Sequence, residues 1–310
     1  MNSSELNKRK DFLEEAIFKN FTVVLFGVVI NFINSLLLYT CFKNPVFTQE
    51  PRYILYMQLI INDIITLSVC VVLFIFSYTI TMGLNVAFCC ILILIASTVY
   101  KNTPLNLAGM AIERFVAICY PLHHARICTV KHTKLLIGII WLLGALPVMV
   151  DLFVVLALSP STFFTSSRMC YTQNVFSFEY NIVSNAAFNI GYMCSVWVLL
   201  FYTYFKVLFS AKAAASEPAQ AKKVRRTILL HGVQLLLCTL SLITPVIDQA
   251  LTVLFPYYRS VIYFCTFILT SILPRLLSPL IYGLRDQKFK KYMKNSMMCG
   301  SVKRAVDLND

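Results

Sequence analysis

Long apolar runs separated by short polar stretches are the main pattern of the chain. Each run has about the 20 residues that a helix needs to cross the roughly 30 Å hydrocarbon core of a bilayer. Because backbone polar groups in lipid must be paired within their own segment, each run predicts a membrane-spanning helix. The seven runs are residues 21–43, 53–79, 86–119, 134–158, 180–209, 226–253 and 257–283.

The composition agrees with this pattern. Of the 310 residues, 58% are hydrophobic and 13% are charged, whereas about 25% of the residues of a soluble protein are charged. We therefore expect an all-α membrane protein, a seven-transmembrane helix bundle over residues 21–283, with a polar extracellular tail over 1–20. The basic, amphipathic stretch that opens residues 284–310 is expected to form a short helix 8 on the lipids of the inner leaflet, followed by a cytoplasmic tail.

The net charge of +13 would also fit a nucleic-acid-binding protein, but the placement of the charges argues against nucleic acid. Of 27 Lys and Arg residues, 19 fall on one set of loops and helix ends. The positive-inside rule places that side in the cytoplasm, with the N-terminus outside and the C-terminus inside. No removable signal peptide is expected. Asn2 begins a glycosylation sequon on the outer side and is preferred to Asn20, which lies too near the bilayer.

Two of the eleven cysteines lie where a disulfide is expected. Most of the others are embedded in apolar runs, where cysteine behaves as a small hydrophobe. Cys89 lies at the outer start of the third run, and Cys170 lies in the oxidising outer loop between the fourth and fifth runs. The prediction is a Cys89–Cys170 bond. Cys90 stays a competing partner, because a helix turns about 100° per residue and only one of the adjacent thiols can face the loop.

Lys101 places a full charge near the middle of the third run. At about 1.5 Å per residue it lies about 18 Å from Cys89 and about 20 Å from Arg114. One interpretation is a structural lysine that snorkels or pairs with an acid of the bundle. The other is a cation that faces a ligand and favours an anionic or carbonyl-bearing molecule, because a desolvated ammonium needs a partner.

Asparagines form a polar stripe on the fifth run. Asn181, Asn185 and Asn189 follow one another at intervals of four residues and so share a helix face. Such a stripe in a membrane must point inward, where it either joins helices by hydrogen bonds or lines a polar cavity. The intramembrane acids Asp63 and Asp248 are likewise expected to face the interior.

The chain lacks the sequence motifs of several enzyme classes. The chain has no P-loop, no GxSxG, no HExxH and no paired-carboxylate constellation, so no enzyme, catalytic residue, metal or cofactor is expected. A small-molecule transporter would also carry charges at the midplane. The odd number of helices, the lack of an internal repeat and the arginine at the inner end of the third run count against it.

Three segments resemble a known family. MAIERFVAICYPLHHA at 110–125 is similar to the MAxxRYVAICxPLxY signature of odorant receptors. ILLHGVQLLLC at 228–238 and LLSPLIYGLRDQKF at 276–289 resemble the sixth and seventh helices of the fish members. On these motifs, and along residues 20–292, the chain resembles a rhodopsin-like G-protein-coupled receptor of the fish-type odorant class.

The resemblance implies roles for individual residues. Arg114 matches the arginine that the active receptor releases to meet the G-protein α-subunit, with Glu113 as its resting partner. Cys89 and Cys170 match the disulfide pair, and the spacing to Arg114 favours Cys89 over Cys90. The hallmark positions of helices 1, 2, 4 and 7 are matched by Asn34, Asp63, Trp141, Pro279 and Tyr282.

Three residues depart from the family pattern. Phe115 replaces the usual Tyr and removes a hydroxyl at the cytoplasmic end. Ser278 replaces the Asn of NPxxY and weakens a polar contact with Asp63. Arg275, one turn before Pro279, is expected near Asp63, where its charge would replace the sodium ion that many receptors of the class hold. We therefore predict no sodium site.

The implied function is that of an odorant receptor at the plasma membrane of olfactory sensory neuron cilia. A small-molecule odorant enters from outside and favours the state in which helix 6 swings outward, and a heterotrimeric G protein of the olfactory stimulatory type then binds the inner face. The main alternative is a receptor for another ligand, such as a peptide or an amine. An amine receptor is expected to carry an acidic residue at the position where the third run has Ala96 and Ser97. The expected pocket residues are Ser97, Tyr100, Lys101, Asn185, Asn189 and Asp248.

Overall fold

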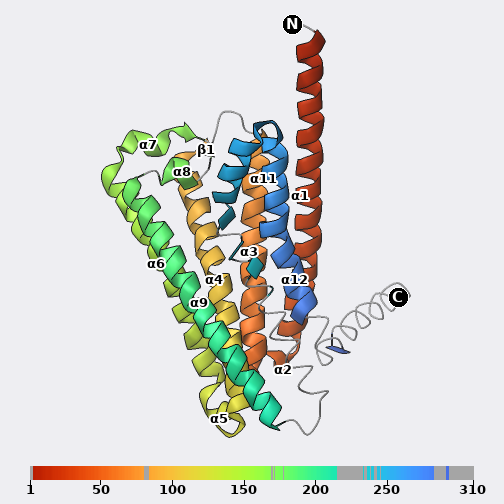
Figure 1. Cartoon of the computed structure of the whole chain (residues 1–310), viewed down its shortest axis with the longest axis vertical. Coiled ribbons are helices and arrows are strands. Elements are labelled where there is room, and N and C mark those ends of the chain that lie inside the picture. Colours follow the sequence, from red (N-terminus) through yellow and green to blue (C-terminus); the bar gives the residue numbers. More distant parts are fainter. Residues whose placement is uncertain are drawn as a thin grey trace, which may run out of the picture.

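The computed structural model of the chain is a bundle of long helices running side by side (Figure 1). It describes residues 3–79, 84–168, 170, 172–176, 178–214, 233, 236–237, 239–240, 243–244, 246–282 and 291–292. The long helices are α1 (Ser3–Lys43), α3 (Pro51–Thr79), α4 (Val86–Cys119), α6 (Val130–Leu158) and α9 (Glu179–Ala214). Helical residues 246–254 belong to the sixth predicted run, which is described only in part.

The last run has three parts that follow one another along a single axis. They are α11 (Arg259–Phe267), the π-helical turn η2 (Ile268–Ile272) and α12 (Leu273–Tyr282). A short 3₁₀ turn, η1 (Pro256–Tyr258), precedes them. Among the described residues, six helices are long and apolar enough to cross a membrane, and they coincide with six of the seven predicted runs.

Short elements close the two ends of the bundle. At one end lie β1 (Leu84–Asn85), α7 (Ser161–Thr165), β2 (Ser167–Arg168) and α8 (Thr172–Val175), and at the other lie α2 (Pro45–Thr48) and α5 (Pro121–Ile127) (Figure 1). β1 and β2 pair antiparallel, with Leu84 opposite Arg168. We call the first end outer and the second inner, following the orientation expected from the distribution of basic residues.

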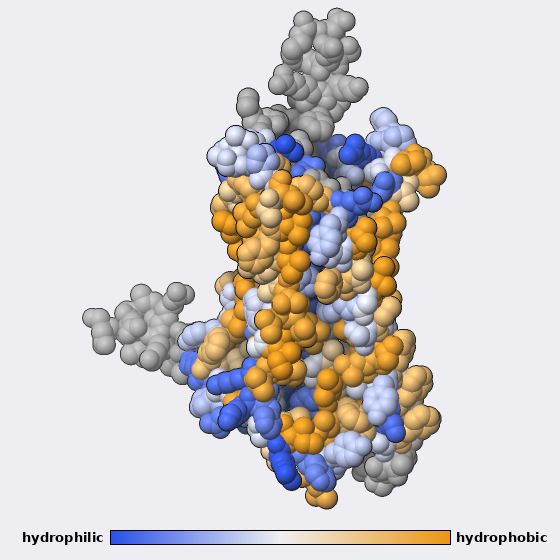
Figure 2. Space-filling view, turned by 90° about the vertical axis from the view of Figure 1, so that its left-hand side faces the viewer, coloured by the Kyte–Doolittle hydropathy of each residue, from blue (hydrophilic) through white to orange (hydrophobic). Residues whose placement is uncertain are grey.

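The surface agrees with a membrane location. Figure 2 shows apolar residues spread over the length of the bundle, with polar residues gathered at its two ends. Large apolar side chains that point outward from α6 and α9 include Leu142, Ile190 and Val198. A soluble protein rarely exposes such a continuous apolar surface, whereas lipid tails accept it.

The first helix is longer than the apolar run predicts. α1 begins at Ser3, so most of the stretch expected as a polar tail is helical. Lys19 is only 4% exposed. Its ammonium pairs with Glu15 one turn earlier, donates to Ser260 Oγ at 2.7 Å and lies 5.7 Å from the ring centroid of Phe264. These contacts with α11 anchor the segment of α1 around Lys19, just before the apolar run.

α4 lies at the centre of the bundle and packs against α3, α6 and α9. Its buried Leu107 and Met110 share one apolar cluster with Leu59 of α3 and Val196 of α9. Asn106, fully buried on the same helix, donates to the Leu55 carbonyl of α3 at 2.9 Å. The helix that carries both Lys101 and Arg114 is thus the one most surrounded by protein, as far as the described residues extend.

Candidate functional site

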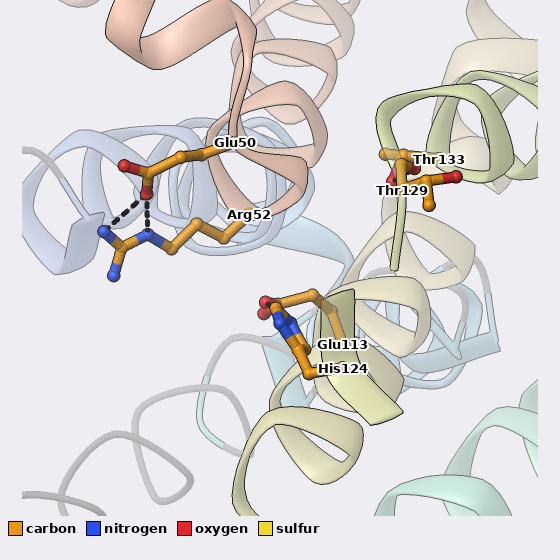
Figure 3. Close-up of polar contacts among 6 residues, drawn as sticks. All are labelled: Glu50, Arg52, Glu113, His124, Thr129 and Thr133. Atoms are coloured by element: carbon orange, nitrogen blue, oxygen red, sulfur yellow. Dashed lines mark hydrogen bonds and ion pairs between the residues drawn. The ribbon is translucent and has the colours of Figure 1, made fainter. Parts of the chain in front are cut away.

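The inner end of α4 carries the pair Glu113 and Arg114. Glu113 is buried, and its Oε1 lies 3.1 Å from Nε2 of His124 on α5. Figure 3 shows the two side chains pointing toward one another. Arg114 is half-buried and makes no ion pair with Glu113. In this structure His124 is the partner of Glu113, and the resting pair of Glu113 with Arg114 implied by the resemblance stays a prediction.

The residues around this pair hold α5 against α4. Phe115 packs edge-on to Tyr120, with centroids 5.7 Å apart, and against Tyr202 of α9 at 5.9 Å. Phe115, at the position where the family usually has Tyr, thus makes an aromatic contact with α9 but offers no hydroxyl for a hydrogen bond. Thr129 caps α6 by accepting from the His132 amide at 3.2 Å, and its carbonyl accepts from Thr133 Oγ1 at 2.9 Å.

Cys128 lies in the same inner loop, between α5 and α6. Burial raises the pKa of its thiol, and the nearby negative charge of Glu113 raises it further. Both effects disfavour a thiolate. The thiol is consequently a poor nucleophile at neutral pH.

At the outer end, a disulfide joins Cys89 of α4 to Cys170, with Cα atoms 5.6 Å apart. Asn85 caps α4 here, since its Oδ1 accepts from the amides of Ala87 at 3.0 Å and Phe88 at 3.4 Å. Cys90, the competing partner, is a buried free thiol. The pairing predicted from the sequence is present in the structure.

Several polar side chains of α1 and α3, Asp63 among them, are buried in the interior. Asp63 is 1% exposed and Asn62 is fully buried. Asn62 Oδ1 accepts from Gln58 Nε2 at 3.3 Å. Asn34 of α1 is also fully buried, and neither of its amide atoms has a hydrogen bond within the described part of the chain. The predicted interior location of these side chains is confirmed.

The guanidinium of Arg275 is bound by carbonyls of its own helix. Its Nη1 donates to the carbonyls of Thr270 at 3.1 Å and Ser271 at 2.9 Å, and its guanidinium carbon lies 5.9 Å from the ring centroid of Tyr100. The π-helical turn η2 leaves these carbonyls open to the side chain. The expected proximity of Arg275 to Asp63, and with it the absence of a sodium site, stays a prediction.

Lys101 is 8% exposed and is held by α9. Its Nζ donates to Asn185 Oδ1 at 3.3 Å, and the Tyr192 hydroxyl donates to its backbone carbonyl. Asn189 Nδ2 also donates to Asn185 Oδ1, at 3.3 Å. Three of the six expected pocket residues, Lys101, Asn185 and Asn189, are thus brought together.

The other expected pocket residues lie apart from this group. Asp248, in helical residues 246–254, faces the Thr266 hydroxyl of α11. Tyr100 lies under Arg275. Ser97 is half-buried and makes no side-chain hydrogen bond among the described residues.

Two further buried polar residues, Asn181 and Asp151, were not among the pocket residues expected from the sequence. Asn181 Nδ2 donates to Asp151 Oδ1 at 3.0 Å and to the Asp151 carbonyl at 3.2 Å. Asp151 is an acid within an apolar helix, and the rule applied to Asp63 would have marked it as well.

Some predicted positions lie outside the described residues. These are Asn2, the side chains of Ser278 and Tyr282, the inner loop from 215 to 232, and most of the predicted helix 8. Within that last segment, Tyr292 is described and packs edge-on to Phe47 of α2, with centroids 5.3 Å apart.

Known proteins resemble this chain along most of its length. Residues 33–282 match the family described as 7 transmembrane receptor (rhodopsin family). Odorant receptor 131-2 of Danio rerio is 32% identical over 285 residues, which are 91% of this chain and 86% of the relative. Olfactory receptor 1073 of Rattus norvegicus is 29% identical over 198 residues, 61% of each chain. Olfactory receptor-like protein OLF4 of Canis lupus familiaris is 29% identical over 198 residues, 59% of this chain and 60% of the relative.

The family match extends from within the first predicted run to the end of α12 and so includes the sixth, partly described helix. It confirms the seven-transmembrane bundle and the receptor class inferred from the motifs at 110–125 and 276–289. Proteins of this family are multi-pass receptors of the plasma membrane, not enzymes, and their partners are G proteins. The chain therefore belongs to the rhodopsin family of seven-transmembrane receptors and, within it, to the odorant receptors.

Proposed function

We propose that this receptor binds a small-molecule odorant from the extracellular side and activates the olfactory stimulatory G protein, raising cAMP in the cilia of olfactory sensory neurons. The observation that carries the proposal is the similarity to an odorant receptor over nearly the whole chain. The expected orientation, with the N-terminus outside, follows from the distribution of basic residues, and glycosylation at Asn2 follows from its sequon on that side.

The proposed mechanism is a shift between two conformations. The odorant lies among helices 3, 5, 6 and 7, near Ser97, Tyr100, Lys101, Asn185, Asn189 and Asp248. It favours the state with an open inner face only by the difference between its affinities for the two states. Moving the equilibrium from 1:99 to 99:1 takes about 5.5 kcal/mol of that difference. Arg114, half-buried and not paired to Glu113, supports the part of this proposal in which it meets the G protein.

The test is a cAMP assay in cells that express the receptor with an olfactory stimulatory G protein. A panel of acids, amino acids, amines, aldehydes and alcohols should contain at least one agonist. Arg114→Ala at matched surface level should abolish the response, while Arg126→Ala on exposed α5 should keep it. No response to the panel at normal surface level would favour a receptor for a different ligand, and substrate uptake without cAMP would favour a transporter.

A further inference from the structure

Two opposite charges are buried within the helical bundle on adjacent helices. Lys101 of α4 is 8% exposed and Asp151 of α6 is 7% exposed. A single buried charge inside a membrane protein is costly unless an opposite charge or several hydrogen bonds balance it. The two side chains do not form a direct ion pair, but each is the charged group with which the other interacts.

α9 bridges the two charges with a pair of amides one helical turn apart. Asn185 turns its oxygen to the Lys101 ammonium at 3.3 Å, whereas Asn181 turns its NH₂ to the Asp151 carboxylate at 3.0 Å. Each amide therefore presents the end of its dipole that suits the charge it meets. Asn189 adds a second donor to the Asn185 oxygen, at 3.3 Å, and helps to fix the orientation of that amide.

We infer that Asp151 is the counter-ion of Lys101, and that Asn181 and Asn185 link the two charges into one neutral unit that joins α4, α6 and α9. The asparagine stripe of the fifth run thus serves as glue between helices. Lys101 thus pairs with an acid of the bundle, as the first of its two interpretations expected, and the hydrogen bond to Asn185 leaves it further ammonium hydrogens. Its acid partner is Asp151.

This arrangement restricts the chemical class of the ligand, and this step rests on the proposed function. An anionic odorant near Lys101 would meet the field of Asp151 as well, and it would leave the buried site with a net negative charge. Burying an uncompensated charge is unfavourable, so the attraction of a carboxylate to Lys101 does not offset the free energy of its lost hydration. A neutral odorant that carries a carbonyl or hydroxyl can accept from the remaining ammonium hydrogens without this cost. The receptor is therefore selective for uncharged, hydrogen-bond-accepting odorants.

A double-mutant cycle on surface expression tests the pairing without any odorant. Lys101→Met and Asp151→Asn each leave one buried charge without its counter-ion and should lower the surface level about three-fold or more. The double variant removes both charges and should recover more than half of the wild-type level. Lys134→Met, at an exposed position of α6, is the matched control and should stay at the wild-type level.

Two results would overturn the pairing. One is a normal surface level for Asp151→Asn alone, and the other is a double variant no better than the worse single variant. Surface levels can be measured even if no odorant of the panel is active. A failure of the proposed odorant function therefore stays distinguishable from a failure of the pairing.

The cAMP panel then tests the ligand class on the wild type and the double variant at matched surface level. Neutral aldehydes, ketones or alcohols should be the agonists of the wild type, and their potency should fall in the double variant, which lacks the ammonium that they accept from. Carboxylic acids should be inactive on both. An acid agonist whose response disappears in the double variant would overturn the inference and make Lys101 the anion-binding residue. A wild type that responds to no compound while reaching the surface would count against the odorant function itself.

Discussion

The carboxylate of Glu113 lies 3.1 Å from His124 Nε2, so the acid at the inner end of α4 is held by α5 and not by the adjacent Arg114. The contact ties α5, the short helix of the second inner loop, to the helix that carries Arg114 (Figure 3). Because activation of the receptor is expected to open this face, we expect the contact to be lost on opening and so to favour the resting state.

Removing the imidazole should therefore raise basal signalling. A partly exposed pair contributes about 0.5–1 kcal/mol, so His124→Ala should raise basal cAMP about two- to five-fold at matched surface level. His123→Ala, at the exposed neighbouring position, should leave it unchanged. Equal basal cAMP in the two variants would show that the Glu113–His124 contact does not restrain the receptor.

Gly144 lies where α6 packs directly against α4. A Cβ added there would lie 2.0 Å from Asn102 Oδ1 and 3.2 Å from the Thr98 carbonyl. Gly144→Ala should force the helices apart, cost about 1–3 kcal/mol and lower the melting temperature of purified receptor. Gly138→Ala on the same helix meets nothing within 4 Å and should be neutral or slightly stabilising. Equal melting temperatures for the two variants would contradict the α4–α6 packing.

The outer disulfide should be required for a stable receptor. It closes a separation of 81 residues, and loss of such a bond typically costs about 2–5 kcal/mol. Cys170→Ser should thus lose most of its surface expression, whereas Cys90→Ala should stay within about two-fold of wild type. Mass spectrometry of the unreduced protein checks the pairing directly, and a Cys90–Cys170 peptide would refute it.

The Cys128 thiol should react slowly with alkylating reagents at neutral pH. Its raised pKa means that the thiolate forms only at higher pH, so the reaction rate should rise with pH well above the range of an ordinary cysteine. Glu113→Gln removes one of the causes and should accelerate alkylation about three-fold at a fixed pH. Glu50→Gln, an acid already paired with Arg52 at 2.7 Å, serves as the control and should have no effect. Quantification of the modified peptide measures both rates.

The lengths of the apolar runs in the sequence predicted most of the helical architecture. Six of the seven predicted runs coincide with described helices, and the family match covers the seventh. Lipid allows few alternatives for an apolar run of about 20 residues. The start of α1 at Ser3 was not predicted, because the residues before the apolar run carry no hydrophobic-length signal. The contact of Lys19 with Ser260, far away in the chain, is likewise visible only in the tertiary structure.

The sequence by itself also determined which side chains had to be inside, since a charge or amide within an apolar run is costly in lipid. Lys101, Asp63 and Asn185 were placed correctly on that ground. Their partners were decided by the tertiary structure alone. Arg275 donates to carbonyls of the π-helical turn, a contact that its position in the sequence did not reveal. Lys101 meets Asn185 because α9 packs beside α4. Which charge faces which depends on helix rotation and packing between segments far apart in the chain, and periodicity within one run does not carry that information.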